Sequence, residues 1–206
     1  MHPDRNSSRS GERELFARPR NAHAFRHVAA LALLGFGSLL AQPTSPPAKA
    51  IPPTTHTYKR VGDLEIKADV YRLSDREVRP VVVWIHGGAL INGHRSGIDG
   101  RVKKMALDAG YALVSIDYRL APETKLPEII KDLEDAFAWV REQGPKLLNV
   151  DPNRMAVAGG SAGGYLTLTA GFRVQPRPKV LVAFWGYGDL VGEWYSSPSP
   201  HPCHHQ

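Results

Sequence analysis

The pattern of hydrophobic and polar positions predicts two kinds of β-strand in this chain. In residues 58–60 and 64–71, apolar positions alternate with polar ones around Gly62-Asp63, which is typical of a β-hairpin with one solvated face at a sheet edge. Residues 81–85 are instead continuously apolar and mostly β-branched, as expected for a central parallel strand that is covered on both faces. Beyond residue 100, strand patterns alternate with helix patterns.

This alternation predicts βαβ units, and therefore an α/β fold in which a mostly parallel sheet carries helices on both faces, as a three-layer sandwich. The clearest helix is predicted over residues 126–142, where apolar residues recur at helical spacing and Pro127 stands in the first turn. The other predicted elements are helices over 102–109 and 162–172 and strands over 111–117, 155–158 and 180–185.

The first 50 residues predict a signal and processing region rather than part of the fold. Residues 28–41 form an apolar block that follows several arginines and precedes Ala48-Lys49-Ala50, a small-residue cleavage pattern. Because the block is shorter than the roughly 20 residues that span a bilayer, we expect a secretory signal peptide, export to the periplasm or beyond, and no membrane span after cleavage. An uncleaved membrane anchor is the alternative. We then predict a linker over 51–56, a folded domain over 57–190 and an irregular tail over 191–206.

The net charge of +6 does not indicate a nucleic-acid partner once its location is considered. Residues 1–50 carry +4 of it, and the rest of the chain has no basic run longer than Lys103-Lys104. The electrostatic footprint of a nucleic-acid-binding protein is therefore missing. The single cysteine, Cys203, excludes an internal disulfide, so that the fold depends on its hydrophobic core.

The strongest chemical signal is Gly159-Gly160-Ser161-Ala162-Gly163, which lies between a strand pattern and a helix pattern. Glycines around a serine permit the sharp turn that presents its hydroxyl as a nucleophile. The alternative is a phosphate-binding loop at a helix N-terminus, but neither common phosphate-binding glycine pattern is present. We therefore predict that Ser161 is the catalytic nucleophile, and we expect neither a cofactor nor a metal.

A second motif, His86-Gly87-Gly88-Ala89, directly follows the predicted central strand. Acyl transfer generates an oxyanion that backbone N–H groups must stabilise, and small residues let the backbone approach the substrate. The separation of 75 residues from Ser161 leaves room for two βα units, which would bring both motifs to one edge of the sheet. By itself the motif indicates only a turn, but together with Ser161 it predicts an oxyanion loop that His86 supports without acting as the base.

With residues 117–123 (DYRLAPE), these motifs resemble the hormone-sensitive-lipase-like branch of the α/β-hydrolase fold. The resemblance covers about residues 57–189 and implies a serine carboxylesterase or lipase that acts on small-molecule esters without a cofactor. It also implies that residues 117–123 form a structural loop. By this resemblance the nucleophile is Ser161 and the oxyanion hole consists of the backbone N–H groups of Gly88, Ala89 and Ala162. Ala89 stands where the family often has a third glycine.

The histidine and carboxylate that a serine nucleophile needs are not recognisable in the 45 residues after Ser161. The family's acid follows a seventh strand and its histidine an eighth, and we find neither strand. Asp189 could be the acid but is better explained as a polar residue at a strand end. The candidate bases lie in a proline-containing tail that nothing visible holds near Ser161: His201, His204 and His205. With Cys203 they resemble a metal site, but no partner cluster exists elsewhere in the sequence. We therefore expect a C-terminally truncated esterase with little or no turnover, whose last strand exposes an edge that promotes self-association. A non-catalytic binding remnant and one half of a two-chain hydrolase are the alternatives.

Overall fold

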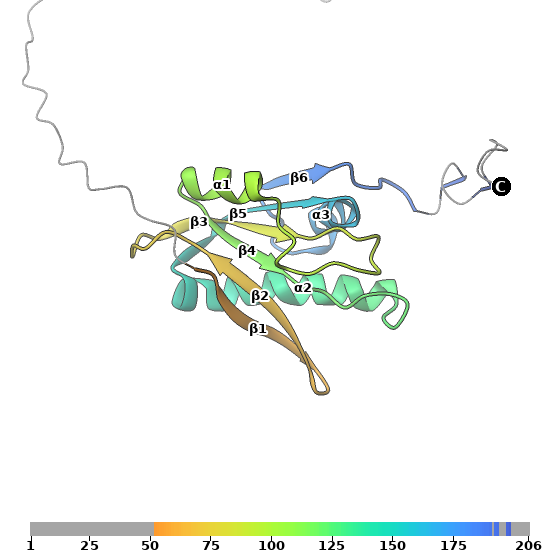
Figure 1. The fold of residues 1–206 in the computed structure, drawn as a ribbon, viewed down its shortest axis with the longest axis horizontal. Helices are drawn as coiled ribbons and strands as arrows, with labels where there is room; N and C mark the ends of the chain where they lie inside the picture. Colours follow the sequence, from red (N-terminus) through yellow and green to blue (C-terminus); the bar gives the residue numbers. More distant parts are fainter. Residues whose placement is uncertain (1–51, 191, 194–196, 199–206) are drawn as a thin grey trace, which may run out of the picture. The chain divides into compact units, whose positions relative to one another are not determined.

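The computed structural model describes residues 52–190, 192–193 and 197–198, and this part of the chain contains a six-stranded sheet with helices on both faces (Figure 1). The elements in chain order are β1 (Thr54–Val61), β2 (Leu64–Tyr71), β3 (Arg79–Ile85), α1 (Gly100–Asp108), β4 (Ala112–Ile116), α2 (Leu126–Gln143), the π-helix η1 (Gly144–Leu148), β5 (Val150–Gly160), α3 (Ala162–Arg173) and β6 (Val180–Phe184). The predicted signal peptide and most of the predicted tail lie outside the described residues. None of the described helices is long and apolar enough to cross a membrane.

The strands lie in the order β1-β2-β4-β3-β5-β6 across the sheet. The hairpin partners β1 and β2 are antiparallel, β2 is antiparallel to β4, and the strands from β4 to β6 are parallel to one another. Helix α1 packs on one face, while α2 and α3 pack on the other. The predicted α/β-hydrolase fold with a mostly parallel sheet is therefore confirmed. The carboxyl ends of β3, β5 and β6 meet at one edge of the sheet, where loops carry functional residues in such folds.

The two hydrophobic cores explain why residues 81–85 are apolar at every position. Val83 and Ile85 point into the core with α2 and α3, where they pack in one cluster with Phe137. Trp84 points to the opposite face and packs in a second cluster with Ala106 of α1. Successive side chains of β3 are thus covered in turn by the helices on the two faces of the sheet, which is the arrangement expected for a central parallel strand.

The hairpin lies at the edge of the sheet as predicted, with β1 outermost, but the predicted solvated face does not extend along the whole of β2. Asp69, a polar position of β2, is only 7% exposed. It is satisfied by the Thr55 hydroxyl at 2.7 Å and by the Arg95 guanidinium at 2.9 Å. Strand β1 begins at Thr54, inside the predicted linker, because Thr54 and Thr55 already pair with β2.

The buried carboxylate of Asp132 joins three parts of the fold. Asp132 lies in α2 with a fully buried side chain, and it accepts a hydrogen bond from Lys59 Nζ of β1 at 2.6 Å. It also accepts hydrogen bonds from Arg119, at 2.7 Å from Nε and at 3.1 Å from the backbone N–H. A buried charge is tolerated only when it is paired and hydrogen-bonded. Asp132 therefore holds the hairpin and residues 117–123 against α2.

We predict that Asp132→Ala lowers the free energy of unfolding by about 3 kcal/mol or more, because Lys59 and Arg119 lose the carboxylate that compensates their charge. Urea denaturation of the purified variant measures this loss. The matched control is Asp108→Ala, which removes an exposed partner of Lys104 and is expected to leave the midpoint almost unchanged. Equal midpoints for the two variants would contradict the role assigned to Asp132.

Candidate active site

Ser161 occupies the tight turn between β5 and α3 with a strained backbone, at φ 56° and ψ −122°. A non-glycine residue in such a conformation costs of order 1–3 kcal/mol and persists only where the surrounding structure holds it. Two hydrogen bonds do so here. The Ser161 N–H donates to the carbonyl of Phe184 at 2.9 Å, and the Ser161 carbonyl accepts from the Tyr165 N–H at 3.0 Å. This is the geometry in which a serine hydroxyl is presented above the end of a strand.

Glycines bring the Ser161 turn into direct contact with the end of β3. A Cβ atom at Gly163 would overlap the carbonyl oxygen of Ile85, and one at Gly159 would lie 2.7 Å from the same oxygen. A Cβ atom at Gly87 would lie only 3.3 Å from the Cβ of Ser161. Because no side chain fits between these segments, the loop that follows β3 lies directly against Ser161.

The loop after β3 leaves the N–H groups of Gly88 and Ala89 available. Gly88, Ala89 and Leu90 all have positive φ, at 110°, 54° and 64°. The Gly88 carbonyl accepts hydrogen bonds from Ile91 and Asn92, both at 2.9 Å, whereas no described residue accepts one from the Gly88 or Ala89 N–H. Positive φ is unfavourable for an alanine, which gives a physical reason for the glycine that the family often has at the Ala89 position.

On the opposite side of the turn, Ala162 is the first residue of α3, so its N–H has no acceptor within the helix. The positive end of the helix dipole adds to the attraction of this N–H for an anion. The glycine contacts therefore bring together two chain segments: the turn with Ser161 and Ala162, and the loop with Gly88-Ala89. The oxyanion role of these three N–H groups stays a prediction.

His86 is held as a buried, neutral residue that supports this loop. Its ring is 2% exposed and stacks on Tyr118, with ring centroids 4.2 Å apart. Burial lowers the pKa of the imidazole, and since a carbonyl only accepts, Nδ1 donates its proton to Gly87 O at 2.8 Å. The Tyr118 hydroxyl donates to the His86 carbonyl at 2.9 Å. Through Tyr118, residues 117–123 fix the backbone that leads into the glycines.

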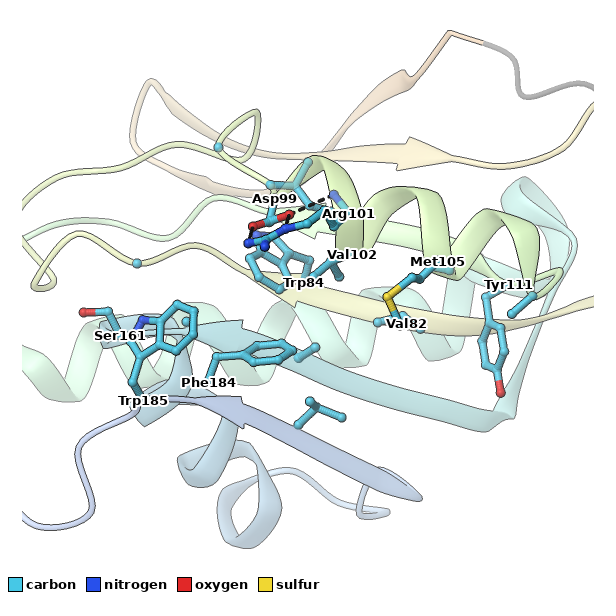
Figure 2. A pocket seen from close by; sticks show the side chains of 18 residues that line it. Val82, Trp84, Asp99, Arg101, Val102, Met105, Tyr111, Ser161, Phe184 and Trp185 are labelled. Atoms are coloured by element: carbon cyan, nitrogen blue, oxygen red, sulfur yellow. Dashed lines mark hydrogen bonds and ion pairs between the residues drawn. The ribbon is translucent and has the colours of Figure 1, made fainter.

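A cavity of about 1030 Å³ opens beside Ser161 on the face of the sheet that carries α1 (Figure 2). Gly87 and Gly160 contribute backbone to its lining, and most of the other lining side chains are apolar. The larger ones are Trp84, Val102, Met105, Phe184 and Trp185. The charged lining residues, Asp99 and Arg101, are paired with each other at 2.8 Å. The cavity therefore suits an uncharged and largely apolar ligand.

The described residues do not bring a general base to Ser161. None of them forms a hydrogen bond with the Ser161 hydroxyl, His86 is directed at Gly87, and Asp189 is an exposed residue beyond β6. The tail residues considered above as a base or as metal ligands, His201, Cys203, His204 and His205, lie outside the described residues. Within the described ranges there is also no cluster of three histidine, cysteine or acidic side chains that would hold a metal ion.

Trp185 was predicted only as the last residue of the strand over 180–185, but in the structure it lines the cavity next to Ser161. Trp185 is 76% exposed and has φ 41°. Its position directly after a parallel strand, at the same sheet edge as the serine turn, is the signal that identifies it in retrospect.

Three comparisons show which known proteins this chain is similar to. The family model BD-FAE matches residues 68–178, which is more than half of the chain. A non-reducing polyketide synthase of Penicillium rubens is 33% identical over 187 residues, covering 78% of this chain and 7% of the synthase. A second such synthase, of Preussia isomera, is 36% identical over 159 residues, covering 70% of this chain and 6% of the synthase. The chain thus spans less than a tenth of these relatives.

Solved structures similar to this chain include esterases. The esterase 2 of Thermogutta terrifontis, solved with butyrate bound, is 27% identical with a TM-score of 0.51, over 61% of this chain and 45% of that one. An esterase of Rhizomucor miehei is 28% identical with a TM-score of 0.51, over 60% of this chain and 38% of that one. This chain spans less than half of either esterase.

We predict that Gly163→Ala destabilises the protein by about 3 kcal/mol or more, since the added Cβ overlaps a backbone oxygen that has no room to move. Urea denaturation followed by circular dichroism measures the change. Gly100→Ala is the matched control, because a Cβ atom there meets open space at the start of α1. If both variants unfold at the same urea concentration, the close approach of α3 to β3 is not a constraint on this fold.

Proposed function

This chain belongs to the BD-FAE family, an α/β-hydrolase-type family, and from that premise we propose that it is a serine esterase for small, uncharged carboxylic esters. The observation that carries the proposal is the strained turn at Ser161, which holds a hydroxyl beside a cavity of about 1030 Å³. The neutral, apolar lining supports an uncharged substrate. The similarity to an esterase solved with butyrate bound supports a carboxylic ester.

In the proposed reaction the Ser161 hydroxyl attacks the ester carbonyl and forms a tetrahedral intermediate. The oxygen that becomes negative accepts hydrogen bonds from the N–H of Ala162 and from those of Gly88 and Ala89. The alcohol leaves, and water then releases the acid from the acyl-serine. We propose that the histidine that accepts the serine proton, and the acid that orients it, come from parts of the protein that the structure does not describe.

A binding module without turnover is the second candidate function. It is favoured by one observation, namely that no described residue forms a hydrogen bond with the Ser161 hydroxyl. Without a base a serine hydroxyl is a poor nucleophile, and loss of triad members lowers rates by about 10⁴ to 10⁶. The two candidates differ in whether the hydroxyl reacts once a base is supplied.

Export and self-association complete the proposal. Export rests on the apolar block 28–41, which lies outside the described residues. Self-association rests on β6, which pairs only with β5 in the described sheet. Val180, Leu181 and Val182 of β6 are 52%, 41% and 39% exposed. An apolar strand with an unpaired edge is a template for pairing with a second copy of the same strand.

We expect the 206-residue chain to hydrolyse p-nitrophenyl butyrate very slowly, and we expect added imidazole to accelerate a Ser161-dependent reaction. Imidazole is small enough to enter the cavity and supplies the missing base. The measurement is the initial rate of nitrophenolate release by the parent and by Ser161→Ala over a range of imidazole concentrations, with the reaction of imidazole alone subtracted.

A rate in the parent that rises with imidazole, and that Ser161→Ala lacks, supports the esterase. If imidazole affects parent and variant equally, the site does not transfer acyl groups and the binding module is the better account. An ordinary esterase rate without imidazole, on the order of 1–10³ per second, would contradict the expected slow hydrolysis and mean that the 206-residue chain supplies its own base, while keeping the serine as nucleophile.

For self-association, we predict that the parent sediments as a mixture containing dimers or larger species and that Val180→Lys shifts it toward the monomer. A lysine on an edge strand disfavours strand pairing because its charge would have to be desolvated. The matched control is Leu147→Lys, which replaces a similarly exposed residue of η1. Analytical ultracentrifugation of a parent that is monomeric throughout would contradict edge pairing, as would equal effects of the two substitutions.

A further inference from the structure

The backbone of Trp185 is strained although its side chain is largely exposed. Trp185 directly follows β6 with φ 41°, a region that bulky side chains rarely occupy, and 76% of its surface is exposed. Its neighbours hold this conformation: the Phe184 carbonyl accepts a hydrogen bond from the Ser161 N–H, and a Cβ atom at Gly186 would lie only 2.5 Å from the carbonyl carbon of Gly164. Strained residues persist where the surrounding structure holds them, and they cluster at ligand-binding sites.

The strained backbone places the Trp185 indole beside the nucleophile. Figure 2 shows the ring next to Ser161, and both residues line the cavity. The indole nitrogen would lie 3.7 Å from a Cβ atom at Gly160, the residue before Ser161. The indole therefore lies beside the backbone of the residue before Ser161, at a separation that would leave room for ordinary van der Waals contact with a Cβ atom there.

Three aromatic rings continue from this point along the cavity wall. Trp185 contacts Phe184, with ring centroids 5.7 Å apart and planes 51° apart, and Phe184 contacts Trp84, at 6.4 Å and 45°. Because neighbouring rings are tilted, they form a corrugated apolar wall. A flexible saturated chain follows such a wall, whereas one flat ring contacts only part of it. Met105, which is 71% exposed, also lines the cavity and adds a further adaptable apolar side chain.

We infer that Trp185 is a substrate-positioning residue that selects esters with a longer saturated apolar chain over esters with a short one. The chain lies along Trp185, Phe184 and Trp84, and this contact directs the ester group to Ser161. The inference extends the proposed function and rests on it, because the bound ester is a substrate only if the protein is an esterase. The binding preference itself does not depend on turnover.

The test measures binding to the Ser161→Ala variant of the full chain, in which no ester is consumed. The probes are methyl hexanoate and methyl acetate, titrated separately and followed by ligand-observed NMR. Each fully buried methylene group strengthens binding about fourfold, so we expect methyl hexanoate to bind at least tenfold more tightly than methyl acetate. We expect Trp185→Ala in this background to weaken methyl hexanoate binding about tenfold and to leave methyl acetate binding unchanged.

Two further variants separate positioning from folding. Trp185→Phe keeps an aromatic wall, and we expect it to retain methyl hexanoate affinity within about threefold. Trp139→Phe is the matched control, because Trp139 packs against His56 and Tyr58 and does not line the cavity. We expect this control to bind both esters as the Ser161→Ala background does.

A second readout reports on Trp185 without removing it. In ¹⁵N-labelled Ser161→Ala protein, the indole N–H signal that disappears in Trp185→Phe belongs to Trp185, and the signal of Trp139 is assigned in the same way. We expect methyl hexanoate to shift the Trp185 signal and not the Trp139 signal. A purely structural role for Trp185 would produce no ligand-dependent shift.

The inference is overturned if methyl hexanoate binds no better than methyl acetate, if Trp185→Ala weakens both esters equally, or if the Trp185 indole signal does not shift. These results are independent of the imidazole experiment. If the imidazole assay shows no Ser161-dependent hydrolysis but methyl hexanoate binds more tightly than methyl acetate, the proposed esterase activity is wrong and the proposed ligand preference stands. If hydrolysis is found but no preference for the longer ester, the esterase activity stands and the role of Trp185 is wrong.

Discussion

The site depends on the contact between the start of α3 and the end of β3. A side chain at Gly163 would overlap the Ile85 carbonyl, so the helix backbone rests directly on the strand backbone. This contact sets the strained turn of Ser161 against the Gly87-Gly88 loop, and it brings N–H groups from two separate segments toward one hydroxyl. Catalysis of acyl transfer requires such donors to be in place before the charge develops. Gly159 and Gly163 are therefore required by the short distance between the two backbones and not by an unusual φ, since the residue with positive φ in this turn is Ser161 itself.

Charged and aromatic residues of segment 117–123 stabilise the end of β3, where it contacts the start of α3. Arg119 is hydrogen-bonded to the buried Asp132 of α2, and Tyr118 stacks on His86 and bonds its carbonyl. Burial lowers the pKa of the His86 imidazole and favours its neutral form, so the loop that carries the proposed oxyanion donors rests on an uncharged ring. The polar groups of this segment thus stabilise the fold, whereas the cavity on the other side of Ser161 is lined mostly by apolar residues. One edge of the sheet can therefore combine rigidly held backbone N–H groups, the proposed oxyanion donors, with an apolar cavity wall.

The sequence predicted the elements well because their burial follows simple periodicities. The continuous apolar run of β3 and the apolar stripe of α2 need no knowledge of distant partners. The errors arise where burial depends on tertiary contacts. Asp69 is buried in β2 because Arg95, far along the chain, neutralises it, and β5 begins at Val150 because that residue pairs with Arg79 before the register shifts. Ser161 and its glycines were recognisable as a local pattern, whereas the place of Trp185 beside Ser161 depends on one unusual φ angle and on the sheet order, which local patterns do not determine.

The central claim is that Ser161 and the free N–H groups around it form one acyl-transfer site. The most direct measurement is a crystal structure of the chain with butylboronic acid, whose boron bonds to a serine oxygen and carries oxygens in the tetrahedral arrangement of the intermediate. The account predicts a bond from boron to Ser161 Oγ, with one boronate oxygen 2.7–3.1 Å from the backbone nitrogen of Ala162 and from that of Gly88 or Ala89. A boronate bound at Ser161 with its oxygens directed only to solvent, or bound elsewhere, would contradict it.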